Sequence, residues 1–141
     1  MIKIRNYQSS DYDQLVELYK QSELYGGQFD ENRDSKEKIS TITKKDPEAV
    51  LVAESNNKIV GTISLIEDSR VAWLFRFAVL KSESANKTIN LLYKKAARIL
   101  KSRGHNQILV YSPNDSSDLD DRYKHLGFEK GNNFTAFWKH I

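Results

Sequence analysis

Positive charge is concentrated in one segment of the chain, where it could bind an anion. Seven basic residues and one acidic residue lie between Lys81 and His105, a net charge of +6, whereas the whole chain carries only +3. An amphipathic helix is predicted from about Lys87 to Arg103. The first turn of a helix presents unpaired N–H groups that favour negative charge, and Ser82 and Ser84 add hydroxyl donors. The start of this helix is therefore a candidate anion site.

A single arginine interrupts a strand that is otherwise apolar. The pattern from Arg70 to Leu80 predicts apolar side chains on both faces, which is typical of a strand inside a sheet. Regular alternation places one set of side chains on one face (Val71, Trp73, Phe75, Phe77, Val79) and the other set on the opposite face (Ala72, Leu74, Arg76, Ala78, Leu80). The Arg76 guanidinium then has two interpretations. It recognises a carboxylate-bearing ligand, or it pairs with an acidic residue at the surface.

The sequence gives little support for a metal site or a cysteine nucleophile. The chain has no cysteine, which excludes disulfides, thiolate metal ligands and a cysteine nucleophile. The histidines are scattered, at His105, His125 and His140. The acidic residues between Asp115 and Asp121 lack the glycine and terminal glutamate of an EF-hand, and favourable charge at a helix N-terminus explains them better. We therefore expect no metal site.

The elements that must position these residues follow from the hydrophobic pattern. Six strands are predicted: Ile2–Arg5, Ala49–Glu54, Lys58–Ile66, Arg70–Leu80, Ile108–Tyr111 and Phe134–Lys139. Four helices are predicted: through Tyr12 to about Glu23, after Ser35, from Lys87 to Arg103, and from Ser117 to His125. The order β-α-α-β-β-β-α-β-α-β predicts an α+β fold with a largely antiparallel sheet. At 141 residues, we expect a single domain over residues 1–141.

Three segments together resemble the GNAT superfamily of N-acetyltransferases, and the resemblance covers essentially the whole chain. They are Phe77-Ala78-Val79, Ala85-Asn86-Lys87-Thr88-Ile89-Asn90 and Tyr123-Lys124-His125-Leu126-Gly127-Phe128. The resemblance implies a mixed, mostly antiparallel central sheet with helices on both faces, and acetyl-CoA as co-substrate without a metal. It places the pantetheine arm of acetyl-CoA on the first segment, with a contact from Asn114. It places the pyrophosphate on the second segment.

The second segment departs from the family pattern, Gln/Arg-x-x-Gly-x-Gly/Ala. Ala85, Thr88 and Asn90 stand at its three defined positions, so both glycines are missing. If the backbone there had positive φ, each non-glycine residue would cost on the order of 1 kcal/mol or more. If the backbone is helical, the amides remain usable and only the added Cβ atoms crowd the ligand.

The resemblance also implies roles for residues around the reacting groups. Tyr123 is expected to act as general acid and protonate the departing thiolate, the alternative being a core tyrosine. Tyr25 and Phe29 lie in the segment where the family builds its acceptor pocket, and Arg76 is expected to join them; an ordinary connecting loop is the alternative. We assign no general base, because no carboxylate lies convincingly near these positions.

Two functions follow from the resemblance. The first is an acetyl-CoA-dependent N-acetyltransferase, in which a primary amine of a small molecule or protein attacks the thioester directly. The second is a catalytically weak or inactive GNAT-fold module that binds CoA and regulates another process. The missing glycines and base favour the second function, and Tyr123 favours the first.

The composition bears on which partners the protein binds and on where in the cell it is located. No stretch approaches the roughly 18 apolar residues that span a membrane, and no signal-peptide pattern is found, so we expect a cytoplasmic protein without a membrane partner. Aromatic residues are not interleaved with the basic ones of the Lys87–Arg103 helix, so we expect no nucleic-acid partner either. The sequence leaves a homodimer open.

Overall fold

The computed structural model describes residues 1–22, 29–114 and 116–141. Its sheet has four antiparallel strands in the order β1-β2-β3-β4. The strands and helices, in chain order, are β1 (Ile2–Asn6), a 3-10 helix (Ser9–Asp11), α1 (Tyr12–Gln21), α2 (Lys36–Lys45), β2 (Val50–Ser55), β3 (Lys58–Glu67), β4 (Ala72–Val79), α3 (Ala85–Ser102) and α4 (Ser117–His125).

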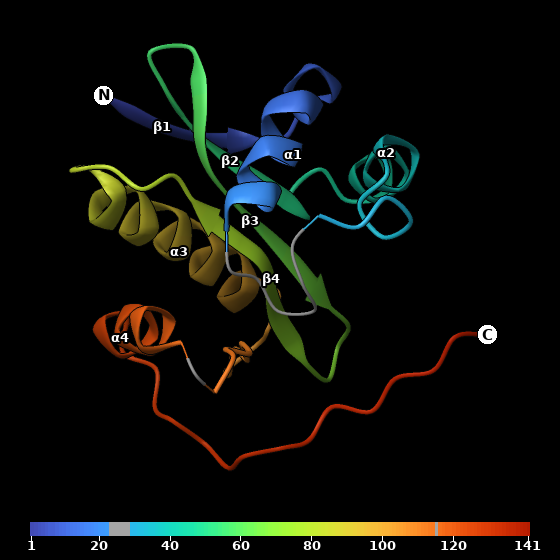
Figure 1. The fold of residues 1–141 in the computed structure, drawn as a ribbon, viewed down its shortest axis with the longest axis vertical. Coiled ribbons are helices and arrows are strands. Elements are labelled where there is room, and N and C mark those ends of the chain that lie inside the picture. Colours follow the sequence, from blue (N-terminus) through green and yellow to red (C-terminus); the bar gives the residue numbers. More distant parts are fainter. Residues whose placement is uncertain (23–28, 115) are drawn as a thin grey trace.

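Helices cover both faces of the sheet, which confirms the predicted fold class (Figure 1). One buried cluster joins α1 and α2 to their face of the sheet through Leu15, Tyr19 and Ile39. The other joins α3 and α4 to the opposite face through residues such as Leu92 and Leu119. Each helix therefore buries one apolar stripe against the sheet.

The helix ends follow the chemistry of their flanking residues. Ser35 and Ser116 cap α2 and α4, because each hydroxyl accepts a hydrogen bond from an amide three residues later. Gly104 and Gly127 follow α3 and α4 with φ of +92° and +90°. This left-handed conformation ends a helix and favours glycine, as predicted for Gly104.

β4 contains a bulge that breaks the predicted alternation. Arg76 and Phe77 together lie opposite Ile63 of β3, and Arg76 has a φ of +50°. Because one extra residue reverses the facing of all later side chains, the predicted sharing of faces is wrong beyond this point. The side chains of β4 that face α3 are Ala72 and Leu74 before the bulge and Phe77 and Val79 after it. The Ala78 side chain faces α1.

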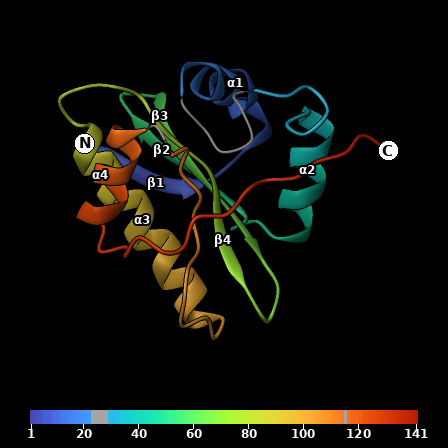
Figure 2. The same cartoon turned by 60° about the horizontal axis from the view of Figure 1, so that its bottom comes forward.

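The two last predicted strands do not form. The segment 108–111 meets β4 at a single parallel bridge between Leu109 and Trp73. Residues 129–141 run as an extended tail that passes in front of β4 in the view of Figure 2, and Phe134, Phe137 and Trp138 are 78%, 94% and 80% exposed. The alternating pattern of the tail favours a strand, but a strand needs a neighbouring edge to pair with, and the tail has none here.

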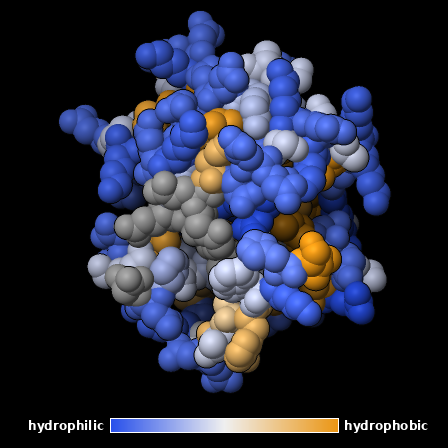
Figure 3. All heavy atoms as spheres, turned by 45° about the vertical axis from the view of Figure 1, so that its right-hand side comes forward, coloured by the Kyte–Doolittle hydropathy of each residue, from blue (hydrophilic) through white to orange (hydrophobic). Residues whose placement is uncertain are grey.

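The molecular surface is mainly hydrophilic on the face shown in Figure 3, with small separate apolar areas. Among the helices of the described residues, none is both long and apolar enough to cross a membrane.

Candidate active site

The edge of β4 that faces away from β3 is the first component of the site. On the side away from β3, the Leu74 N–H donates to the Leu109 carbonyl, and the Leu109 N–H donates to the Ala72 carbonyl, each at 2.9 Å. Farther along this edge, the Phe77 carbonyl accepts a hydrogen bond from the Arg122 guanidinium at 3.0 Å. A side chain therefore occupies a position on the edge where a neighbouring strand would otherwise bond.

Arg76 lies buried on the α1 side of the bulge. Its guanidinium donates to both carboxylate oxygens of Asp34, at 3.1 Å from Nε and 2.8 Å from Nη2. It also lies over the rings of Tyr19 and Phe75, 5.5 and 4.8 Å from their centroids. Of the two interpretations from the sequence, the structure shows pairing with an acidic residue, but in the interior instead of at the surface. Contact between Arg76 and an acceptor stays a prediction.

The start of α3 is helical throughout, which answers the question of the missing glycines. Ala85 is the first helical residue, and in the described chain only Asn56, Asn57 and Arg76 combine positive φ with a side chain. The substituted positions at the start of α3 are therefore not strained. The described backbone offers no acceptor to the amides of Asn86 and Lys87, as is usual in a first helical turn.

Apart from Ala85, which is half-buried, the predicted pyrophosphate-binding residues divide into two groups. Thr88 and Ile89 are buried against the sheet, and the Thr88 hydroxyl donates to the Ser84 carbonyl at 3.1 Å. Asn86, Lys87 and Asn90 are exposed. The second group can present side chains to a ligand, whereas the first group anchors the helix.

Gly61 of β3 allows α3 to approach the sheet closely. A Cβ atom on Gly61 would lie 2.9 Å from Thr88 Cγ2 and 3.0 Å from Leu92 Cδ1. These distances are shorter than van der Waals contact, so a side chain here would force the Thr88 and Leu92 side chains, or the helix that carries them, to shift. Sequence analysis missed this role, although a glycine inside a strand often marks such an approach.

Tyr123 is a buried residue of α4. Its ring meets that of Phe128 edge to face, with centroids 5.7 Å apart. Burial raises the pKa of the Tyr123 hydroxyl, and the neighbouring Arg122 guanidinium opposes this rise. The phenol is therefore neutral at physiological pH and able to donate a proton.

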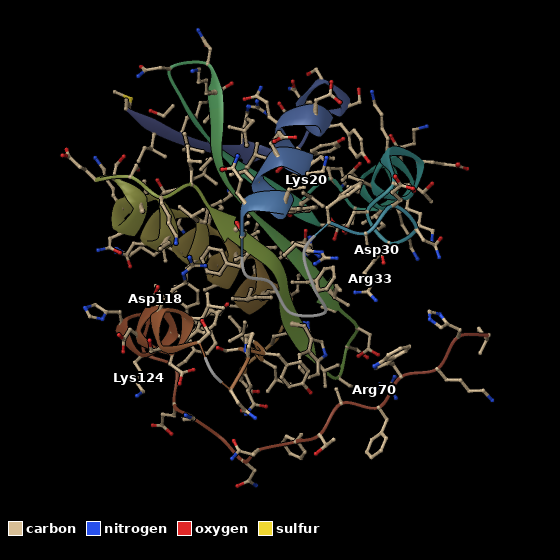
Figure 4. The ribbon with its side chains drawn as sticks, viewed as in Figure 1. Lys20, Asp30, Arg33, Arg70, Asp118 and Lys124 are labelled. Carbon is tan, nitrogen blue, oxygen red and sulfur yellow. The ribbon has the colours of Figure 1, made fainter. Side chains whose placement is uncertain are left out.

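Arg122 is the site residue that sequence analysis did not find. It bonds to the Phe77 carbonyl and covers the Phe77 ring, with Cζ 5.4 Å from the centroid. An arginine next to a tyrosine on a short polar helix looks like part of a solvated face, so the sequence carried no signal for it. Its exposed neighbours on α4, Asp118 and Lys124, point outward in Figure 4.

The remaining predicted residues lie at different depths. Phe77 and Val79 belong to the α3-side core and Ala78 to the α1-side core. Asn114 is exposed in a turn, and Tyr25 lies outside the described residues. Phe29 is half-buried, with the Lys20 ammonium 5.5 Å from its ring centroid, and Figure 4 places Lys20 at the end of α1. The described residues contain no cluster of acidic and histidine side chains suited to a metal ion.

Solved structures of similar fold include complexes with coenzyme A, with a bisubstrate analogue of it and with acetyl-CoA. PaiA N-acetyltransferase from Thermoplasma acidophilum, in complex with coenzyme A, has a TM-score of 0.80 and 22% identity, over 95% of this chain and 93% of that one. AAC(6')-Iy in complex with a bisubstrate analogue has a TM-score of 0.75 and 17% identity, over 100% of this chain and 99% of that one. A predicted acetyltransferase with acetyl-CoA from Clostridium acetobutylicum has a TM-score of 0.71 and 16% identity, over 97% of this chain and 96% of that one.

Sequence comparison assigns the family. Among curated protein sequences, none matches this chain significantly. A family model described as acetyltransferase (GNAT) family matches residues 12–128, which is most of the chain. The resemblance seen in the sequence is thereby confirmed, and the chain belongs to the GNAT acetyltransferase family.

Proposed function

We propose that the protein transfers an acetyl group from acetyl-CoA to a primary amine of a small molecule or a protein. One observation carries the proposal. A buried, neutral tyrosine, Tyr123, directly follows the residue whose guanidinium bonds to the outer edge of β4, the edge away from β3. Membership of the family and neighbours named as complexes with coenzyme A or acetyl-CoA support the choice of co-substrate.

The start of α3 is proposed to hold the pyrophosphate. The exposed residues Asn86, Lys87 and Asn90 surround amides that lack backbone acceptors, and an anion completes the hydrogen bonding of such a helix end. Lys81 adds positive charge beside it. The pantetheine arm would run along Phe77, Ala78 and Val79, with Asn114 beside it.

The reaction needs one bond to form and one to break. The neutral amine attacks the thioester carbonyl carbon, the new C–N bond forms, and the C–S bond breaks with its electron pair going to sulfur. A backbone N–H near Val79 is proposed to stabilise the negative charge on the carbonyl oxygen. Tyr123 gives its proton to the departing sulfur, and the amine loses its own proton to solvent, because no base is assigned. Phe29, Tyr25 and Arg76 are proposed to border the acceptor.

Cofactor binding is tested by thermal unfolding with and without CoA. A ligand at 100 times its Kd adds about 2.7 kcal/mol, which raises Tm by several degrees in a domain of this size. The absence of a shift at millimolar CoA would overturn the proposal. A shift without turnover on a panel of amines would instead indicate a CoA-binding regulatory module.

The role of Tyr123 is tested with a matched pair of variants. Removing a general acid costs on the order of 100-fold in kcat, so Tyr123→Phe is expected to lose that activity while keeping its CoA-dependent shift. Tyr93→Phe is the control, because Tyr93 contacts the same Phe128 ring from α3. Release of the CoA thiol measures turnover, and equal activity in the two variants would remove Tyr123 from the reaction.

A further inference from the structure

We propose that the Arg122 guanidinium occupies the place of the cofactor on the outer edge of β4 in the free protein, and that acetyl-CoA displaces it in order to bind. The inference rests on the proposed function, which places the pantetheine arm along Phe77, Ala78 and Val79. It extends that function by naming a residue that sets the affinity for the cofactor, and by giving the direction of its effect.

The outer edge of β4 has an unpaired stretch beyond Leu74. The Leu74 N–H is the last group on this edge that bonds to the described backbone, through Leu109. Farther along, the Leu80 N–H donates to a carbonyl of β3, and strand alternation therefore turns the N–H and the carbonyl of Val79 toward the outer edge. The Phe77 carbonyl faces the same way, since it accepts from α4. This stretch can therefore bond to a ligand as one strand bonds to another.

The pantetheine arm is a ligand of this kind. Its amide groups can donate to a carbonyl and accept from an N–H, as a neighbouring strand does. An amide that approached the Phe77 carbonyl would meet the Arg122 guanidinium, whose Nη1 lies 3.0 Å from the carbonyl oxygen. The guanidinium also covers the Phe77 ring, with Cζ 5.4 Å from the centroid, so it fills space beside the edge and not only one lone pair. The guanidinium and the arm therefore compete for one place.

The Arg122 guanidinium is easier to displace than that of Arg76. Arg76 donates to both carboxylate oxygens of buried Asp34. Arg122 bonds to a neutral carbonyl, which carries less charge than a carboxylate, and no described carboxylate lies within ion-pair distance of it. The residue is half-buried on a surface helix, so its long side chain can turn toward solvent while α4 stays in place.

The sign of the effect distinguishes this role from simple attraction between charges. CoA carries phosphate groups, so removing a cation near its site weakens binding when attraction is all that the cation provides. Removing the Arg122 side chain instead frees the Phe77 carbonyl before CoA arrives. A hydrogen bond from a charged donor contributes enough that its absence in the free protein should tighten CoA binding about tenfold.

Calorimetric titration with CoA tests the direction of the change. Arg122→Ala is expected to bind CoA about tenfold more tightly than the wild type. Lys124→Ala is the matched control, because Lys124 is an exposed cation of the same helix that points outward in Figure 4. The control is expected to bind CoA as the wild type does or more weakly. Equal or weaker binding by Arg122→Ala would overturn the inference.

Thermal unfolding separates displacement from a purely structural role. Without CoA, Arg122→Ala is expected to melt a few degrees below the wild type, because the bond to Phe77 is lost. At saturating CoA the bond is absent from both proteins, so the two Tm values should converge. A difference in Tm that persists at saturating CoA would show that Arg122 only stabilises the fold, and would overturn the inference.

A measurement on the wild type covers the case in which Arg122→Ala does not fold. Nuclear magnetic resonance of protein with ¹⁵N-labelled arginine follows the guanidinium N–H protons, and those of Arg122 are identified by their absence from Arg122→Lys. Addition of CoA is expected to speed their exchange with water, because the bond to the Phe77 carbonyl is broken. Exchange that CoA leaves unchanged would overturn the inference.

The two proposals fail in different ways. If neither the wild type nor Arg122→Ala binds CoA, the proposed function fails and the inference fails with it. If the wild type binds CoA and Arg122→Ala does not bind it more tightly, only the role of Arg122 fails.

Discussion

The buried pair of Arg76 and Asp34 provides the sharpest test of the fold, through the variant Asp34→Asn. The two side chains are 1% and 4% exposed. Asp34 also accepts a hydrogen bond from the Asp30 amide at 3.0 Å, which ties the segment before α2 to β4. Asparagine keeps the size of the side chain but removes its charge, so the Arg76 cation stays buried beside a neutral amide.

The expected loss of stability follows from this burial. Removing one partner of a buried ion pair costs about 3–5 kcal/mol. For a chain of 141 residues, each kcal/mol lost from the free energy of unfolding lowers Tm by roughly 3 °C. We therefore expect Asp34→Asn to lower Tm by about 10–15 °C, while contacts with the Tyr19 and Phe75 rings keep Arg76 in place.

Thermal and urea unfolding followed by circular dichroism measure the effect. The control is Arg70→Gln, which breaks the exposed pair with Asp68 and is expected to leave the transition nearly unchanged. A double variant, Asp34→Leu with Arg76→Met, is expected to be more stable than Asp34→Asn, because apolar side chains fill the site without an unpaired charge. A Tm for Asp34→Asn within about 2 °C of the wild type would refute the reasoning.

Three further predictions concern packing and pH. Gly61→Ala is expected to lose about 1–3 kcal/mol in urea unfolding, because the new methyl group meets Thr88; equal midpoints would contradict the close approach of α3. Burial raises the pKa of Tyr7 to about 12 and also that of Tyr19, so these phenols ionise first in the unfolded chain, and urea midpoints should fall as the pH rises above about 10. The hydrogen bond from Arg103 lowers the pKa of Asp46, so its contribution is present above pH 4 and is lost as the pH falls further; Arg103→Gln should reduce this acid dependence.

Local patterns predicted the regular elements well. The apolar stripe of α3, the glycine after it and the burial of β4 on both faces follow from periodicity and turn chemistry, which depend on neighbouring residues. The bulge at Arg76 could not be predicted in this way. The bulge is defined by the pairing of β4 with β3. The alternation of apolar residues along one strand does not show which residues of the partner strand lie opposite them.

Long-range pairing limited the prediction of the site. Sequence analysis singled out Arg76, but its partner Asp34 is 42 residues away and was one of many acidic residues. Arg122 gave no signal, because its role depends on the Phe77 carbonyl of another element. Tyr123 was singled out through a motif and not through physics, since a buried tyrosine is equally suited to a core, and its role in the reaction stays a prediction.

In the tail, sequence analysis predicted an element that does not form. Its alternation predicts a strand, and the residues have the β-branched and aromatic character that strands favour. Strand formation is nevertheless a property of two segments, and the only ion pair that the described tail makes with the body joins Lys130 to Asp120.

The bulge at Arg76 has a consequence for how this chain tolerates change in length. In a strand without a bulge, one additional residue would move every later side chain to the other face. Deleting Arg76 would remove the bulge and leave Phe77 and Val79 facing α3 and Ala78 facing α1, because the remaining residues then alternate regularly. The bulge thus absorbs one residue of chain length, and the end of β4 keeps its side chains in the same halves of the core with or without that residue.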